Sequence, residues 1–334
     1  MRRLVCGTHG HCFDGLASAT LFTEILEEIE GPLSTDYLAC GYGPGHQTPP
    51  DLDGDFNALL DYRFVGDQRL THYFDHHGTA FANDEESLLF QKKQATRPEH
   101  FVWDPQAVSC ATMIQSHAQS VWGLSLDRHR ELLAWAHKID GARFESASEA
   151  SSRQHPIMRL VCVVEKFGGK TFLSKAIPIL RSEGLLALTE AGFVQDRFRT
   201  LAPQYQNYST RVSARGHMEG AVAFVDLTEA PVNVVTKFCQ YESFPSCVYS
   251  VLVAQMSNSV KVSVGYNPWC QQTRNADLGK ICAAHGGGGH PYVGAVALPR
   301  DEVRVALELG RKVMAELNRA QQEGAQENSA REDT

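Results

Sequence analysis

The chain has 334 residues, a length that suggests two domains rather than one hydrophobic core. Its hydrophobic content of 43% and charged content of 21% are typical of globular proteins. A formal net charge of −8 argues against a protein that coats duplex nucleic acid, and without an apolar stretch of about 18 residues we expect no membrane span.

Strand and helix patterns alternate over the first 80 residues. Strand-like runs occur at Leu4–Gly7, Tyr37–Cys40, Phe56–Leu60 and Leu70–Phe74. After the first run, apolar positions with a period of 3.6 residues predict a helix from Asp14 that ends at Gly31. This alternation predicts an α/β domain with an open, mostly parallel sheet flanked by helices.

Three aspartates of this region, Asp14, Asp61 and Asp75, each follow a predicted strand. Ligands of open α/β sheets bind at the carboxyl ends of the strands, so we expect these side chains to meet at one edge of the sheet.

Helices are predicted at Ala107–Trp122 and Arg128–Phe144, and most of 145–215 is also expected to be helical. The second helix places Asp140 near its C-terminal end, where an acid is electrostatically disfavoured unless a cation lies nearby. That mismatch makes Asp140 a candidate metal ligand.

After residue 215 the strand pattern returns. Strands are predicted at Gly220–Leu227, Cys247–Ala254, Val260–Tyr266 and Tyr292–Leu298, and helices at Pro231–Tyr241, Asn275–Ala284 and Asp301–Gln321. We therefore predict a catalytic domain at 1–190, a helical linker at 191–215, a smaller α/β domain at 216–320 and a disordered tail at 321–334.

The nine cysteines are scattered without a CxxC pair. An odd number of cysteines without the spacing of a disulfide framework is typical of a reducing compartment, so we expect a cytoplasmic protein.

The aspartates, with His9 and the pair His76-His77, suit Mn²⁺ or Mg²⁺ better than a closed zinc site. Phosphoryl transfer commonly uses two cations about 3.5–4 Å apart, and a carboxylate that bridges them fixes this separation. Asp61 stands alone in the sequence between the other candidate ligands, and it is the candidate bridge.

Five motifs in order carry a resemblance to a known family. They are His9-Gly-His-Cys-Phe-Asp14, Asp61, Asp75-His76-His77, Asp140 and Gly286-Gly-Gly-Gly-His290. Over roughly residues 3–300 the chain resembles the DHH/DHHA1 phosphoesterase superfamily, which includes RecJ-like exonucleases, nano-RNases and cyclic-dinucleotide phosphodiesterases. The resemblance implies a two-domain α/β fold, the second domain being DHHA1, and hydrolysis of short oligonucleotides or linear or cyclic dinucleotides by water that two divalent ions activate.

The resemblance also implies a role for each matching residue of the first domain. His9 would bind the first metal, Asp14, His76 and Asp140 the second, and Asp61 both. His77 would face the substrate phosphate, and Asp75 would orient the histidine pair, so that Asp75, His76 and His77 form the catalytic triplet.

In the second domain, the resemblance implies close approach of the backbone of Gly286, Gly287, Gly288 and Gly289 to a phosphate or nucleotide, to which His290 would donate. Where family members tend to carry a Ser-Arg pair, this chain has Val264–Pro268, and Arg274 is the candidate replacement. Trp269 is a candidate for stacking on a base, against the alternative of a packed corner.

The first motif departs from the family pattern, which usually has two aspartates separated by one residue. Cys12 stands where the first aspartate is expected, so either His11 or Cys12 supplies the missing ligand or the first metal loses one. A thiolate or a second imidazole would favour Co²⁺, Fe²⁺ or Zn²⁺ over Mn²⁺.

Two other functions stay open on these residues. One is a phosphomonoesterase or a polyphosphate or pyrophosphate hydrolase, and the other is a nucleotide-binding sensor with a degenerate metal site, for which Cys12 is the motivation. The expected partner is a short single-stranded oligonucleotide or dinucleotide, and a homodimer is compatible with the sequence.

Overall fold

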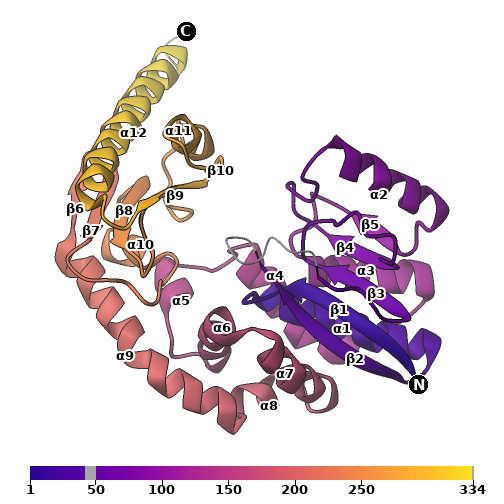
Figure 1. The fold of residues 1–334 in the computed structure, drawn as a ribbon. Helices are drawn as coiled ribbons and strands as arrows, with labels where there is room; N and C mark the ends of the chain where they lie inside the picture. Colours follow the sequence, from indigo (N-terminus) through magenta and orange to yellow (C-terminus); the bar gives the residue numbers. More distant parts are fainter. Residues whose placement is uncertain (42–49, 333–334) are drawn as a thin grey trace. The chain divides into compact units, whose positions relative to one another are not determined.

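The computed structural model describes residues 1–41 and 50–332 and divides into two compact units (Figure 1). The first unit comprises Met1–Phe144 and Arg153–Arg199, and the second comprises Glu145–Ser152 and Thr200–Thr334. The chain therefore passes between the units three times, because Glu145–Ser152 belongs to the second unit while its flanking residues belong to the first. The boundary near residue 200 lies inside one helix, α9 (Gly192–Arg215).

A five-stranded parallel sheet forms the centre of the first unit, which confirms the predicted fold class. The strand order is β2-β1-β3-β4-β5. The strands are β1 (Arg2–His9), β2 (Leu33–Cys40), β3 (Phe56–Leu60), β4 (His72–Asp75) and β5 (Phe101–Trp103). The three-residue strand β5 is too short to show a pattern in the sequence, and we did not predict it.

The strand order reverses between β1 and β3. From β1 the chain continues to β2 on one side, and it then returns past β1 to β3, β4 and β5 on the other side. In open α/β sheets, ligands bind outside the carboxyl ends of the strands at such a reversal. His9 ends β1 and Asp61 directly follows β3, so both residues lie at this point.

Helices cover the parallel sheet. They are α1 (Phe13–Glu30), α2 (Asp84–Thr96), α3 (Cys110–Trp122), α4 (Arg130–Asp140), α6 (Pro156–Phe167), α7 (Lys170–Ser182) and α8 (Leu185–Glu190), with a 3-10 turn at Asp127–His129 before α4. Helix α1 is buried along most of its length and packs against α3, α4 and α7. Helix α2 was not apparent in the sequence because Phe90 is its one buried residue.

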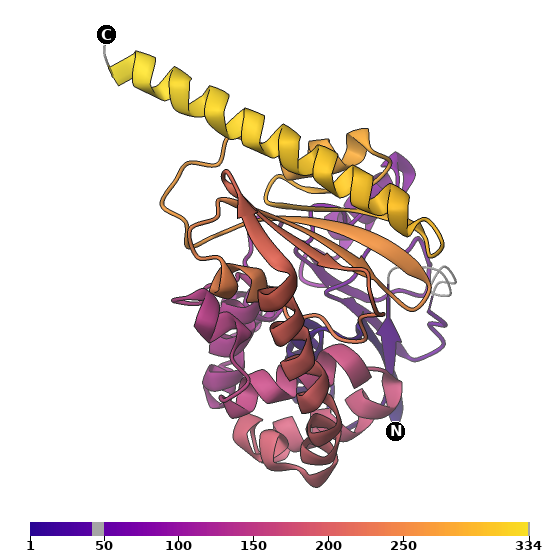
Figure 2. The same ribbon diagram turned by 90° about the vertical axis from the view of Figure 1, so that its left-hand side faces the viewer.

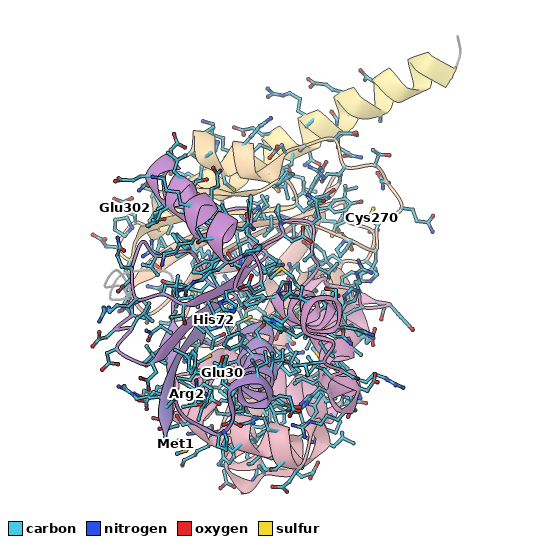
Figure 3. The ribbon with its side chains drawn as sticks, turned by 90° about the vertical axis from the view of Figure 1, so that its right-hand side faces the viewer. Met1, Arg2, Glu30, His72, Cys270 and Glu302 are labelled. Carbon is cyan, nitrogen blue, oxygen red and sulfur yellow. The ribbon has the colours of Figure 1, made fainter. Side chains whose placement is uncertain are left out.

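An ion pair joins the start of β1 to the end of α1. It lies at the end of the sheet opposite the strand reversal. Arg2 Nη1 and Glu30 Oε2 form an ion pair of 2.6 Å at the amino-terminal end of β1 (Figure 3). The pair joins the last residue of α1 to the first residue of β1, and the two elements also pack against each other.

A six-stranded mixed sheet forms the second unit, in the order β10-β11-β9-β8-β7-β6. All neighbouring strands are antiparallel except β7 and β8, which are parallel. The strands are β6 (Gly216–Glu219), β7 (Val222–Leu227), β8 (Tyr249–Gln255), β9 (Ser259–Tyr266), β10 (Gly288–His290) and β11 (Val293–Pro299). Helix α12 (Val303–Glu332) packs on β7, β8 and β9 (Figure 2), and α11 (Leu278–Ala284) packs on β10 and β11.

Two short helices complete the second unit, α5 (Ala147–Ser151) and α10 (Cys239–Ser243). Ala147 of α5 is buried in one apolar cluster with Tyr241 and Cys247, and Ser151 Oγ donates a short hydrogen bond to Glu242. These contacts make α5 part of the second unit.

Three predictions about this unit are wrong. Residues 231–236 are not helical, because the β-branched run from Val232 to Thr236 disfavours a helix, and α10 begins only after Phe238, whose φ is 70°. The predicted glycine loop is in part the edge strand β10. The predicted disordered tail is helical to Glu332, and residues 333–334 lie outside the described part of the chain.

Among the residues that the structure describes, no helix combines the length and the apolar character that crossing a membrane requires.

Candidate metal centre

Asp61 lies at the strand reversal, buried and with a left-handed backbone. Its φ is 54°, its side chain is 1% exposed, and its backbone N–H donates to Phe74 O at 2.9 Å. Aspartate tolerates this conformation better than most residues, and such backbone outliers concentrate at functional sites. The hydrogen bond to Phe74 fixes the carboxylate relative to β4.

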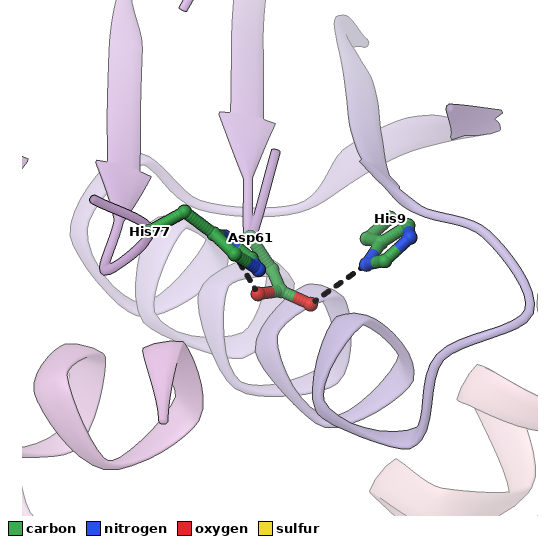
Figure 4. Close-up of side chains that lie close together, drawn as sticks. All are labelled: His9, Asp61 and His77. Atoms are coloured by element: carbon green, nitrogen blue, oxygen red, sulfur yellow. Dashed lines mark ion pairs between the residues drawn. The ribbon is translucent and has the colours of Figure 1, made fainter. Parts of the chain in front are cut away.

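The Asp61 carboxylate lies between two imidazoles from the ends of β1 and β4, the strands on either side of β3 (Figure 4). Asp61 Oδ2 is 3.8 Å from His9 Nδ1, and Oδ1 is 3.8 Å from His77 Nδ1. Ligand atoms of His9, Asp61 and His77 lie within 4.8 Å of one another, which is close enough for one metal ion to bind all three.

A second group of potential ligands shares the same carboxylate. His76 Nε2 lies 3.4 Å from Asp61 Oδ1 and 3.8 Å from Asp14 Oδ2, and these three residues also meet within 4.8 Å. Asp140 Oδ2, at the end of α4, is 3.3 Å from the same His76 nitrogen. Asp61 therefore belongs to both groups, as a bridging carboxylate would.

Asp14 is held by the start of another helix. Its Oδ2 accepts a hydrogen bond of 2.6 Å from Cys110 N, and its Oδ1 accepts one of 3.0 Å from Ala111 N. Both donors belong to the first turn of α3, where the helix dipole favours a negative charge. Helix α3 thus stabilises the buried carboxylate and fixes its orientation.

Hydrogen bonds outside the two groups orient the histidines. His76 Nδ1 donates to Ala107 O at 3.1 Å, which leaves Nε2 directed at the carboxylates. His77 Nδ1 donates to Asp75 Oδ1 at 2.7 Å, and Tyr73 Oη donates to Asp75 Oδ2 at 3.0 Å. We predicted that Asp75 orients both histidines, and the hydrogen bond of Asp75 is to His77.

The cluster concentrates negative charge in a buried place. Burial, with the charges of Asp61 and Asp140, raises the pKa of Asp14 well above its usual value. Burial alone would lower the pKa of His76, but Asp61, Asp14 and Asp140 outweigh it and raise the pKa. The arrangement therefore favours a positive charge among the three carboxylates.

Two buried atoms at the centre of the cluster are without a hydrogen-bond partner within residues 1–41 and 50–332. They are Asp61 Oδ2 and His76 Nε2, and both are ligand atoms of a type that divalent cations accept. Leaving buried polar atoms unpaired costs free energy, so the cluster fits a bound cation better than it fits a purely structural role. The donors are nitrogen and carboxylate oxygen, which suits Mn²⁺ and related divalent ions.

Neither candidate for the missing ligand belongs to the two groups of potential ligands. His11 belongs to neither group, because its Nδ1 lies 3.2 Å from Glu165 O and its N–H donates to Gly168 O at 3.1 Å. The metal role of His11 stays a prediction, which this position does not support. Cys12 is also outside both groups, although its pKa is raised by burial and by the nearby charges of Asp61, Asp14 and Asp140.

The predicted phosphate-binding residues lie in the second unit. Gly286 has a φ of 81° and Gly289 one of 152°, and both therefore require glycine. A Cβ on Gly287 would lie 2.1 Å from Ala295 O, whereas Gly288 is neither crowded nor left-handed. Packing therefore does not explain why residue 288 is a glycine, and Gly288 stays a candidate ligand-binding residue. His290 is exposed and stays a candidate as well.

Trp269 packs against other aromatic side chains, which was the alternative to stacking on a base. Its ring lies 5.4 Å from Phe238 and 6.3 Å from Tyr241, within the apolar cluster that also holds α5. Tyr73, which supports Asp75, was missed, although residues two apart in a strand share a face and the sequence places Tyr73 two residues before Asp75. The supporting carbonyl of Ala107 has no signal in the sequence.

Comparison with known proteins gives the fold alone. No family model and no curated protein matches the chain. Among solved structures, a pGpG-specific phosphodiesterase, PggH from Vibrio cholerae, is 17% identical with a TM-score of 0.66, covering 94% of this chain and 99% of its own. The DHH domain of a member of a family of ribosomal proteins is 12% identical with a TM-score of 0.54, covering 95% and 87%.

RecJ of Thermus thermophilus, solved with Mg²⁺, is 13% identical with a TM-score of 0.54. The match covers 94% of this chain and 50% of RecJ, so this chain spans about half the length of RecJ. The chain has the fold of the DHH-domain proteins. In this DHH fold, the two groups of potential ligands lie at the strand reversal of the first unit, and β10 lies at the edge of the sheet of the second.

Proposed function

We propose that the protein is a metal-dependent phosphodiesterase that hydrolyses short oligonucleotides or dinucleotides. The observation that carries the proposal is the shared position of Asp61 in two groups of potential ligands, His9/Asp61/His77 and Asp14/Asp61/His76. Two-cation phosphoesterases need a ligand set of this kind, because both ions must be held about 3.5–4 Å apart.

The residues divide into two sets around the shared carboxylate. His9 and His77 would hold one divalent ion, and Asp14 and His76, with Asp140 beside them, would hold the other. Bound there, the two ions would polarise the phosphodiester and lower the pKa of the attacking water. His77 thus serves as a candidate ligand in addition to its predicted contact with the substrate phosphate.

Other groups of the chain, a side chain and a backbone carbonyl, would orient these ligands. Asp75 fixes His77, and Ala107 fixes the tautomer of His76. Burial, with nearby carboxylates, raises the pKa of both Cys12 and Cys110 well above the usual thiol value. Both thiols are therefore protonated as long as no metal ion binds them.

Charge and fold both support a small nucleotide substrate. The net charge of −8 disfavours long duplex nucleic acid, and PggH, which shares the fold over nearly its whole length, acts on a dinucleotide. Arg274, His290 and the glycine run Gly286–Gly289, the last two of which belong to β10, are the residues that we assign to substrate binding.

The test compares Asp61→Asn with Asp51→Asn. Asp51 is a matched control because its side chain is 80% exposed and pairs with Arg69 away from both ligand groups. We expect the wild type and Asp51→Asn to retain two metal ions per chain by elemental analysis and to release mononucleotides from a dinucleotide with Mn²⁺. Asp61→Asn should lose metal and turnover together. Unchanged turnover in Asp61→Asn would sink the assignment.

A nucleotide-binding sensor is the second candidate, and Cys12 favours it. The residue stands where the family pattern has an aspartate, and neither ligand group includes its thiol. Zero or one ion per wild-type chain, with dinucleotide binding and no turnover, would support the sensor. Phosphate release from pyrophosphate or from a 3′,5′-bisphosphate, with intact dinucleotide, would instead support a phosphomonoesterase or pyrophosphate hydrolase.

A further inference from the structure

Strand β6 forms one edge of the six-stranded sheet in the second unit. The strand order is β10-β11-β9-β8-β7-β6, so among the residues that the structure describes β6 pairs with β7 alone. Residues 217–219 are exposed, and β6 contains neither a proline nor a lysine, the residues that commonly protect such edges. The outer side of its backbone is therefore open to pairing with a further strand.

A groove lies beside the same strand. Its volume is about 530 Å³, and its lining includes His217 and Glu219 of β6 and Arg311 and Met314 of α12. Helix α12 packs on β7, β8 and β9. The groove shows that the side of β6 that faces α12 is accessible, so the side chains of an added strand have room there.

The charges at the two ends of β6 are complementary when two copies of the strand run antiparallel. With His217 of one copy opposite His217 of the other, Glu219 lies beside Arg215, the residue directly before β6, at both ends of the contact. Opposite charges across an antiparallel pair stabilise it. Arg215 is 40% exposed, and its Nε and Nη2 lie near Glu229 and Asp226. Its remaining nitrogen, Nη1, is the donor for Glu219 of the second copy.

The other face of β6 is complementary in shape. Gly216 lies against Phe244, because a Cβ on Gly216 would lie 2.4 Å from Phe244 Cε2. In the same register, Met218 of the second copy lies opposite Gly216, on the face that carries this ring. Met218 is 36% exposed in the single chain, and a thioether beside an aromatic ring is a favourable contact. The pairing therefore covers an exposed apolar side chain on each copy.

We infer that β6 joins two copies of this chain, paired antiparallel about a twofold axis at His217, so that their sheets become continuous. Such a contact is isologous, since each copy contributes the same strand. The sheet edge at β10 stays unused, so the inference does not depend on the proposed function. The strand contributes four residues per copy, which is small for a stable interface, and we expect a dimer that dissociates on dilution.

The first experiment measures the oligomeric state of the full chain by sedimentation velocity, at concentrations up to about 100 μM, where weak homodimers are detectable. The wild type should form a dimer in a concentration-dependent way. Glu219→Lys places like charges beside Arg215 at both ends of the contact and should weaken dimerisation at least about tenfold. Glu323→Lys makes the same change in charge at an exposed position of α12, and this control should dimerise as the wild type does.

The second experiment tests the register by cross-linking. Directly opposite residues of antiparallel strands have Cα atoms about 4.5–5.5 Å apart, a separation that a disulfide bond spans. His217→Cys, on the twofold axis, should therefore form a covalent dimer when it is oxidised with diamide. Met218→Cys, opposite Gly216, is the matched control and should form no more covalent dimer than the wild type with its nine cysteines.

Three outcomes would overturn the inference. They are a wild type that stays a monomer over the whole concentration range, a Glu219→Lys protein that dimerises as strongly as the wild type, and a His217→Cys protein that cross-links no more than Met218→Cys. The third outcome, with a dimeric wild type, would place the contact on another surface. Turnover of a dinucleotide should be the same in all of these variants, because none of them changes a potential metal ligand or a residue assigned to substrate binding.

Discussion

Asp75 and His77 are joined by a hydrogen bond of 2.7 Å between Oδ1 and Nδ1, in a place where the aspartate is fully buried. The bond links a strand residue to a potential metal ligand two positions later, beyond the end of β4. Because Tyr73 Oη holds the other oxygen at 3.0 Å, the orientation of His77 depends on side chains of one strand.

Asp75→Asn should therefore impair metal binding without unfolding the domain. The variant keeps the shape of the side chain and loses its charge. Loss of such a supporting partner typically lowers metal affinity or activity by about 10–100-fold. Tyr73→Phe removes one bond to Asp75 and should have a smaller effect. Titration of the metal-free proteins with Mn²⁺ checks both, and equal affinity in Asp75→Asn and wild type would show that Asp75 does not support His77.

His11 and His76 should differ sharply although both were candidate ligands. His76→Ala removes a nitrogen that lies within 3.4 Å of Asp61 and Asp140, and we expect it to reduce the bound metal. His11→Ala removes a ring that faces Glu165 O, so its metal content should equal that of the wild type. Elemental analysis of the two purified variants is the measurement, and metal loss in His11→Ala would support the predicted metal role of His11.

Gly287→Ala and Gly288→Ala should separate folding from binding at two adjacent glycines. A Cβ at Gly287 would overlap Ala295 O, so we expect a loss of about 1–3 kcal/mol in the free energy of unfolding. Gly288→Ala meets open space and should keep the wild-type stability while weakening nucleotide binding. Urea denaturation and calorimetry give the two quantities, and a Gly288→Ala protein with wild-type affinity would exclude close approach of the ligand there.

His72 should make the chain less stable in acid. Its ring is 4% exposed and stacks on His100 at 4.4 Å, and burial lowers its pKa to about 3. Below a pH of about 6.5 the unfolded chain binds a proton at this histidine, whereas the native chain does not. The neutral ring therefore contributes its full stability above that pH, and the contribution declines toward pH 3. The decline amounts to about 1.4 kcal/mol per pH unit for one proton.

His72→Phe keeps an aromatic ring and removes the titrating group. Its free energy of unfolding should fall less steeply than that of the wild type between pH 6 and 4 (roughly the window in which an unfolded histidine is protonated). The exposed His217 provides the control, since His217→Phe should follow the wild-type slope. Parallel slopes for His72→Phe and wild type would show that His72 does not carry this pH dependence.

The parallel sheet and the position of Asp61 were predictable because both depend on local patterns. Strands end in polar residues, and in a parallel sheet these ends meet at one edge, so Asp61 and His9 could be brought together from the sequence. The structure places Asp14, His76 and Asp140 with them, although their metal role stays a prediction. The hydrogen bond between Asp14 and the start of α3 could not be predicted from the sequence, because it joins residues almost a hundred positions apart.

The sequence left questions open where distant contacts decide the outcome. Trp269 is packed because Phe238 and Tyr241 lie against it, and nothing near Trp269 in the sequence indicates those partners. His11 faces Glu165, more than 150 residues away, for the same reason. The exposure of Tyr292 could not be predicted either, because it depends on how the β10–β11 hairpin is held by Arg274 and Leu278.

The three passages of the chain between the units limit how this protein can be divided or recombined. Cutting between residues 199 and 200 would leave α5 on the first fragment, and the second fragment would lose Ala147 from its apolar cluster and Ser151 as the partner of Glu242. The second unit is therefore not a contiguous cassette. A gene fusion that exchanges it for another substrate-binding domain must also replace Glu145–Ser152, a segment that begins five residues after Asp140.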